Sequence, residues 1–192
     1  MGVQRNTQEN AMLELLLSRE AIAVRVKELA IQISRDYAGA DLLLVGVLKG
    51  AFVFLADLIR ALEIPVQVEF VRLASYGKGA TSAGQVRVLM DLEVSIAGRH
   101  VLIVEDILDT GLTLGFLLER LKARQPASLK LCVLLNKHVR RAQEVIPDYR
   151  GFNVPADFVV GYGIDYAERY RFLPAVYSLT FPPRDCQHPE QK

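Results

Sequence analysis

The feature that most constrains the fold is an unbroken apolar run at residues 42–48, Leu-Leu-Leu-Val-Gly-Val-Leu. A strand with one face in water alternates apolar and polar residues, so a run without alternation is typical of a strand that is covered on both faces. Shorter runs of the same character lie at 101–104 and 129–135. The chain is therefore expected to form a parallel sheet with helices on both sides.

Helical patterns alternate with these strands. Ser18 is a suitable N-cap for a helix that extends to about Arg35, and residues 51–62 predict a second, mostly buried helix. Leucines at i, i+3, i+4 and i+7 from Leu114 predict a third helix. Further strands are predicted at 66–73, 86–90, 158–163 and 176–180. The alternation defines an α/β fold, in which ligands bind beyond the carboxyl ends of the strands.

Composition narrows the class of protein. With 51% hydrophobic and 23% charged residues, the 192-residue chain is expected to fold as one globular domain over residues 12–181, between a flexible extension (1–11) and a flexible tail (182–192). The 23 Lys and Arg residues nearly balance 22 Asp and Glu residues. A broad polyanion-binding surface needs a larger excess of positive charge, so any bound anion must be held locally.

Cysteine usage and hydropathy predict the compartment. The chain has two cysteines, Cys132 and Cys186, which cannot form a disulfide scaffold. Its first residues carry no apolar segment of a secretory signal, and the longest apolar stretches break at Lys49 and Asp57, too early for a membrane span. We therefore expect a cytoplasmic protein with no membrane partner.

The chemistry concentrates in residues 105–113, which follow a predicted strand. Glu105, Asp106 and Asp109 place three carboxylates within five residues, an arrangement that suits cations or sugar hydroxyls. A Thr-Gly-Leu-Thr turn then leads into a helix, whose free N–H groups and dipole favour a phosphate. The alternative is an ordinary strand-to-helix turn in which Asp109 and Thr110 cap the helix. Capping does not explain the acidic pair, which favours a functional site.

Five pieces of the sequence resemble one enzyme family. Residues 101–113 resemble the phosphoribosyl pyrophosphate signature of type I phosphoribosyltransferases. Leu48-Lys49-Gly50, Ser75-Tyr76-Gly77, Lys137 and residues 158–166 are similar, in order and spacing, to the bacterial-type hypoxanthine(-guanine) phosphoribosyltransferases. The likeness spans roughly residues 13–181.

The resemblance implies the type I phosphoribosyltransferase fold, with a central, mostly parallel sheet flanked by helices, a small hood subdomain and a mobile lid loop. It implies purine salvage: transfer of the 5-phosphoribosyl group from phosphoribosyl pyrophosphate to hypoxanthine, and to guanine, giving IMP or GMP and pyrophosphate. It further implies Mg2+ as cofactor and a homodimer or homotetramer.

The resemblance also implies roles for residues of the acidic segment. Glu105 and Asp106 would bind the ribose hydroxyls, directly or through Mg2+. Asp109 would be the catalytic group that exchanges a proton with purine N7. The residues that would hold the 5′-phosphate are Asp109, Thr110, Gly111, Leu112 and Thr113.

Other implied roles lie at the remaining strand ends. Leu48, Lys49 and Gly50 would bind pyrophosphate, with a cis peptide between the first two, and Arg171 would contact it as well. Lys137 would donate to the purine 6-oxo group, which disfavours the amino group of adenine. Three residues complete the purine site: Phe158 by stacking, Val159 by backbone contacts and Asp165, which would also be the carboxylate ligand of Mg2+. Ser75 and Tyr76 would belong to the lid.

Two alternatives remain open. A catalytically silent regulator of the same fold that binds nucleic acid predicts a concentrated basic face, yet the chain has only a modest cluster at 137–141, so no nucleic-acid partner is expected. A signalling receiver domain also uses clustered acids and a strand-end lysine. It needs an acidic pair after the first predicted strand, where this chain has Lys49-Gly50. Singly, Lys137 could be a solvated lysine and Phe158 a core residue.

Overall fold

The structure is a computed structural model, and it describes residues 11–76, 85–137, 143–155 and 157–181. The predicted flexible ends fall almost wholly outside these ranges. So do the loop at 77–84, which the lid prediction concerns, and most of the basic cluster at 137–141.

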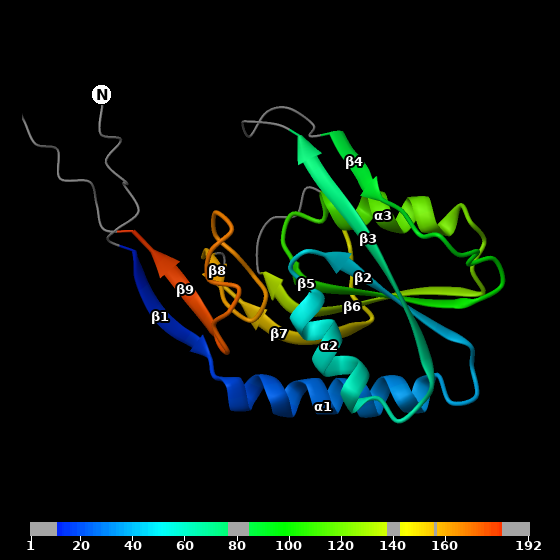
Figure 1. Cartoon of the computed structure of the whole chain (residues 1–192), viewed down its shortest axis with the longest axis horizontal. Helices are drawn as coiled ribbons and strands as arrows, with labels where there is room; N and C mark the ends of the chain where they lie inside the picture. Colours follow the sequence, from blue (N-terminus) through cyan, green and yellow to red (C-terminus); the bar gives the residue numbers. More distant parts are fainter. Residues whose placement is uncertain (1–10, 77–84, 138–142, 156, 182–192) are drawn as a thin grey trace, which may run out of the picture.

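The main sheet has six strands in the order β4-β3-β2-β5-β6-β7 (Figure 1). Its members are β2 (Leu42–Leu48), β3 (Val66–Tyr76), β4 (Gln85–Met90), β5 (His100–Leu108), β6 (Ser128–Lys137) and β7 (Tyr149–Val154). The pairs along β3-β2-β5-β6-β7 are parallel, and β4 joins the edge antiparallel to β3. The mostly parallel sheet expected from the apolar runs is confirmed.

Helices cover both faces of this sheet. Leu42 and Leu44 of β2 pack in a core with α1 (Arg19–Asp36) and α2 (Phe52–Ala61). Their neighbours Leu43 and Val45 point the other way, into a core with α3 (Leu112–Lys122). Because successive side chains of a strand point to opposite faces, β2 is buried from both sides. This double burial is why its sequence shows no alternation.

A smaller sheet stands at the end toward which the parallel strands point (Figure 1). It consists of β1 (Met12–Leu17), β9 (Val176–Thr180) and β8 (Val159–Val160), in the order β1-β9-β8 and antiparallel throughout. Met12 lies opposite Thr180, so this sheet joins the two ends of the described chain. It corresponds to the hood that the family resemblance implies.

The first predicted helix is confirmed closely. Ser18 is the N-cap of α1, and its side chain accepts a hydrogen bond from the Ala21 N–H at 3.2 Å.

Within the described residues, neither this helix nor another is long and apolar enough to cross a membrane.

Several strand predictions were wrong in extent. The strand expected at 101–104 runs on to Leu108, because Glu105 pairs with Val133 and Leu108 with Asn136 of β6. The strand expected to end at residue 73 continues to Tyr76, where it pairs with β4. The strand expected at 158–163 is reduced to β8, because Gly161 and Gly163 take positive φ angles and turn the chain. Strands β1 and β7 were not predicted.

Candidate active site

The site lies between β2 and β5, where the order in which strands are added to the sheet reverses direction. From β2 the chain crosses through α2 to β3 on one side, and from β5 it crosses through α3 to β6 on the other. The carboxyl ends of β2 and β5 are neighbours, and the connections that leave them diverge. A crevice for ligands forms at such a switch point in open α/β sheets. The segments that begin at Leu48 and Asp109 therefore line it from opposite sides.

The turn after β5 is shaped as an anion cradle. Gly111 is the N-cap of α3 at φ +82°, and no side chain caps the helix. A side chain at Gly111 would collide with the Gln143 carbonyl, so both conformation and space require glycine. A cavity of about 170 Å³ here is lined by Glu105, Ile107, Leu108, Asp109, Thr110, Gly111, Thr113 and Leu114. The alternative that Asp109 and Thr110 merely cap the helix is wrong, and the first N–H groups of α3 remain available to a ligand.

The acidic pair is held at the end of a buried strand rather than in a loop. Asp106 is buried and packs against Gly50, where a Cβ would collide with its carboxylate. The Oε2 atom of Glu105 is buried without a hydrogen-bond partner. Burial, and next the adjacent negative charge of Asp106, raise the pKa of Glu105 well above its usual range. An unpaired buried oxygen is costly, so this position suits a ligand hydroxyl or cation.

Three side chains from separate elements meet beside the cradle. Lys137, at the end of β6, lies with its Nζ 3.0 Å from Oδ2 of Asp109. The lysine is buried, whereas the Asp109 side chain is 48% exposed. Lys137 Nζ also lies 6.0 Å from the ring centre of Phe158, a residue that is 62% exposed. The alternatives of a solvated lysine and a core phenylalanine are both wrong.

On the other side of the crevice, two cations meet the segment after β8. The Leu48–Lys49 peptide is cis, as the resemblance implies. Lys49 Nζ lies 3.0 Å from both carboxylate oxygens of Glu168. Arg171 Nη2 pairs with Asp165 Oδ1 at 2.6 Å and with Glu168 Oε2 at 3.3 Å, and its Nη1 donates to the Gly163 carbonyl at 2.8 Å. The structure thus brings together Lys49 and Arg171, two of the residues predicted to contact pyrophosphate. Both of them bind the carboxylate of Glu168.

Glu168 had no predicted role. It lies between Asp165 and Arg171, two residues with implied roles, and this position is the signal that could have found it. Hydrogen bonds from Lys49, and next from Arg171, lower the pKa of Glu168. Its backbone N–H donates to Asp165 Oδ2 at 2.8 Å, which anchors the turn.

The remaining predicted residues lie at the rim. Val159 is buried in β8 beside Phe158. Leu112 is the first residue of α3 and has an exposed side chain. Ser75 and Tyr76, assigned to the lid, end β3 and pair with Val86 and Gln85 of β4. They mark where the lid would be anchored.

The oxygen ligands that the crevice offers suit a Mg2+ ion that is shared between the protein and a bound ligand. Within the described residues, no group of three or more His, Cys, Asp or Glu side chains could enclose a metal. Asp165 supplies one carboxylate on the pyrophosphate side, and Glu105 has its unpartnered oxygen near the cradle. Mg2+ usually takes one or two carboxylates and completes its shell with water and substrate phosphates. The residues therefore fit an ion that arrives with a phosphorylated ligand.

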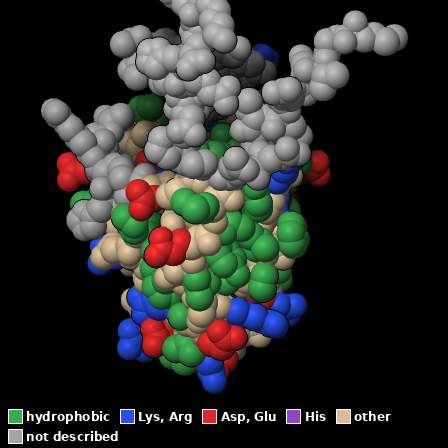
Figure 2. All heavy atoms as spheres, turned by 90° about the vertical axis from the view of Figure 1, so that its left-hand side faces the viewer, with side chains coloured by type: hydrophobic (Ala, Val, Ile, Leu, Met, Phe, Trp, Pro, Cys, Tyr) green, Lys and Arg blue, Asp and Glu red, His purple; other side chains and the backbone are tan. Residues whose placement is uncertain are grey.

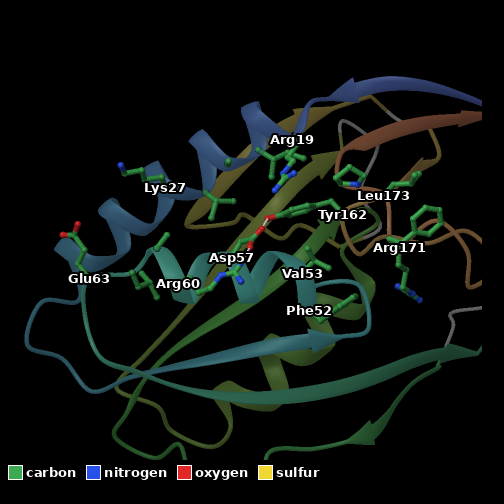
Figure 3. A pocket seen from close by; sticks show the side chains of 17 residues that line it. Arg19, Lys27, Phe52, Val53, Asp57, Arg60, Glu63, Tyr162, Arg171 and Leu173 are labelled. Atoms are coloured by element: carbon green, nitrogen blue, oxygen red, sulfur yellow. Dashed lines mark hydrogen bonds and ion pairs between the residues drawn. The ribbon is translucent and has the colours of Figure 1, made fainter.

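A larger cavity of about 1140 Å³ lies outside this crevice (Figure 3). It opens between α1, α2 and the chain around residues 162–174. Inside it Tyr162 donates a hydrogen bond of 2.6 Å to Asp57 on α2. Arg171 lines its edge, so one segment separates this cavity from the crevice.

Known proteins are similar to this chain in fold and in sequence. A family model described as the phosphoribosyl transferase domain matches residues 13–167, which is the class of protein that the fold and the crevice define. The hypoxanthine-guanine phosphoribosyltransferase of Mycobacterium avium is 49% identical over 179 residues, covering 90% of this chain and 87% of the relative. The hypoxanthine phosphoribosyltransferase of Salmonella typhimurium is 46% identical over 165 residues, covering 85% of this chain and 93% of the relative.

A crystal structure of a hypoxanthine-guanine phosphoribosyltransferase from Bacillus anthracis superposes with a TM-score of 0.83 at 44% identity. It covers 89% of this chain and 100% of its own. The chain therefore belongs to the phosphoribosyltransferase family, in its hypoxanthine-guanine branch.

The buried carboxyl of Glu105 predicts how stability depends on pH. A raised folded-state pKa means that the ligand-free protein loses stability as the pH rises above the usual value of 4.5 toward the folded value, by at most about 1.4 kcal/mol per pH unit. Glu105→Gln removes this loss. Urea unfolding should find the variant more stable than wild type at pH 8, with the difference shrinking toward pH 5. Glu119→Gln, an exposed change on α3, is the control. The same pH dependence in wild type and Glu105→Gln would contradict the prediction.

Proposed function

We propose that this protein is a purine salvage enzyme that transfers the 5-phosphoribosyl group from phosphoribosyl pyrophosphate to N9 of hypoxanthine, and of guanine. The products are IMP or GMP and pyrophosphate. The observation that carries the proposal is the 3.0 Å pair of Lys137 and Asp109 beside the exposed ring of Phe158. The relatives named above carry this activity in their names and support the assignment.

The pair matches one edge of a 6-oxopurine. O6 and N7 lie side by side on that edge, so Lys137 can donate to O6 while Asp109 faces N7. Adenine presents an amino group in place of O6, and its N–H groups would meet an ammonium that has no acceptor to offer. The Phe158 ring supplies a stacking surface that suits any purine. Base identity therefore depends on the lysine, and affinity depends in part on the ring.

The donor spans the rest of the crevice. Its 5′-phosphate would accept from the first N–H groups of α3 and from Thr110 and Thr113. The ribose hydroxyls would donate to Glu105 and Asp106. The diphosphate would reach the Leu48–Gly50 loop and Arg171, whose guanidinium can bind two phosphoryl oxygens at once.

The chemistry requires positioning more than a covalent intermediate. The N9–C1′ bond forms as the C1′–O bond to diphosphate breaks, and Asp109 accepts the proton that leaves N7. The carboxylates would also stabilise positive charge that develops on the ribose. Bound Mg2+ would supply charge neutralisation at the departing diphosphate. Closure of the lid anchored at Ser75 and Tyr76 would exclude water from C1′.

The regulator alternative has no comparable support. Lys137, the first residue of the basic cluster on which it depends, is buried and faces Asp109. The nearly balanced charge of the chain also argues against a nucleic-acid surface. Because the Cys132 thiol is free and buried, we propose a cytoplasmic, reducing setting for the enzyme.

The test is turnover by the purified protein. With Mg2+ and phosphoribosyl pyrophosphate, hypoxanthine and guanine should yield IMP and GMP, while adenine should yield little AMP. Chromatography of the nucleotide products measures all three. No turnover with either 6-oxopurine would reject the proposal.

Asp109→Asn tests the proton acceptor. The amide keeps the shape and an oxygen for Lys137 but cannot take the N7 proton, so kcat should fall by about 100- to 10,000-fold. The dissociation constant for phosphoribosyl pyrophosphate should change little. Steady-state kinetics and calorimetric titration separate these effects. Unchanged turnover would remove Asp109 from this role.

We further propose a homodimer or homotetramer in which a second copy covers an apolar face. This face consists of Phe52, Phe172 and Leu173 around the larger cavity (Figure 3). Phe172 is 84% exposed and Phe52 45% exposed. Asp57 and Arg60 beside this face pair with each other, so both charges keep a partner when a second copy covers it. Viewed from the end that carries the small sheet, hydrophobic side chains gather between charged ones (Figure 2).

Phe172→Ser should therefore shift the protein toward monomer in sedimentation velocity, because an exposed aromatic is the kind of anchor that subunit contacts bury. Phe116→Ser on α3, on the opposite side of the main sheet, is the control. A wild-type monomer, or an unshifted variant, would contradict the prediction.

A further inference from the structure

Glu168 is the one strongly engaged carboxylate of the crevice for which the proposed reaction has no use. Its two oxygens each lie 3.0 Å from Lys49 Nζ, and one of them lies 3.3 Å from Arg171 Nη2. The contact joins residues 119 positions apart in the chain. It is therefore a tertiary arrangement and not a local helix or turn pair.

The geometry is that of a bound anion. A carboxylate offers two oxygens that share one negative charge, as two oxygens of a phosphoryl group do, and lysine and arginine bind both kinds of group. Lys49 and Arg171 are the two cations that the donor diphosphate would contact. Glu168 thus makes, from within the chain, contacts that a phosphoryl group would make.

The turn that presents Glu168 is conformationally specialised. Ala167 and Glu168 have φ angles of +52° and +60°, which residues with side chains adopt seldom and which cluster at functional positions. The Glu168 N–H is bound to Asp165, and Tyr166 and Arg169 form a bridge around it. This turn directs the glutamate back toward the end of β2.

We propose that Glu168 is an internal counter-ion of the pyrophosphate site, which holds Lys49 and Arg171 in the free enzyme and is displaced by the diphosphate of the donor. The inference rests on the proposed function. The Glu168 side chain is 66% exposed and the Lys49 side chain 45% exposed, so water can replace the contact readily. When Glu168 occupies the site in part of the molecules, the apparent dissociation constant for the diphosphate equals the intrinsic constant divided by the fraction of molecules in which the site is free.

The consequence is opposite to that of an ordinary binding residue. Removing a group that helps to bind diphosphate weakens binding, whereas removing a competitor strengthens it. Glu168→Gln should lower the dissociation constant for magnesium pyrophosphate by about threefold to tenfold, the combined effect expected when two exposed ion pairs, with Lys49 and with Arg171, are removed. The KM for phosphoribosyl pyrophosphate should fall in parallel, while the KM for hypoxanthine stays unchanged.

Isothermal titration with magnesium pyrophosphate measures the binding directly. Glu119→Gln on α3 makes the same change of charge on the opposite face of the sheet and should leave affinity unchanged. The comparison is repeated in a Lys49→Met background, where Glu168 has lost its main partner. There the gain from Glu168→Gln should shrink to about twofold or less.

Unchanged or weaker pyrophosphate binding by Glu168→Gln would overturn the proposal. An equal gain in both backgrounds would overturn it too, since it would report only general repulsion between carboxylate and polyanion. The titration needs no turnover, so it remains decisive if the purified protein makes no IMP. Failure to make IMP would instead reject the proposed function.

Discussion

Burial of β2 and β5 from both faces is the constraint from which the site follows. The leucines and valines of β2 enter two separate cores, one under α1 and α2 and one under α3. Helices on both faces require crossovers in both directions from the centre of the sheet, and these leave a crevice where the two central strands end. The site therefore belongs to the best-buried part of the molecule while its reactive groups remain accessible.

Three cations of the crevice each face a carboxylate. Lys137 faces Asp109, Lys49 faces Glu168, and Arg171 faces Asp165. Under the counter-ion proposal, ligand binding at the pyrophosphate side is an exchange of partners, in which diphosphate oxygens replace the carboxylate of Glu168. This accounts for how a chain of nearly zero net charge can be suited to a highly charged donor. The same exchange would favour release of pyrophosphate, because Lys49 and Arg171 have a partner to return to.

The sequence predicted what depends on local pattern. The run at 42–48, the Ser18 cap and the glycine turn at Gly111 were all recognisable, because burial and backbone conformation restrict residue types locally. Strands β1 and β7 were missed since they are held by pairing with other strands, β1 with the remote β9 and β7 with β6, and Gly151 of β7 is explained only by the Leu134 carbonyl beside it. The partnership of Lys49 and Glu168 has no local signature for the same reason. Family resemblance located the site segments, but not their counter-ions.

The joining of the two chain ends in the small sheet has a consequence for biosynthesis. Phe158 is held by a 2.7 Å hydrogen bond from the Leu179 N–H to its carbonyl, and β9 is held in turn by β1. Because β9 lies near the end of the described chain, the wall of the crevice at Phe158 cannot be completed until almost all of this domain has been synthesised. Under the proposed function, recognition of the base would thus depend on the last strand to be made.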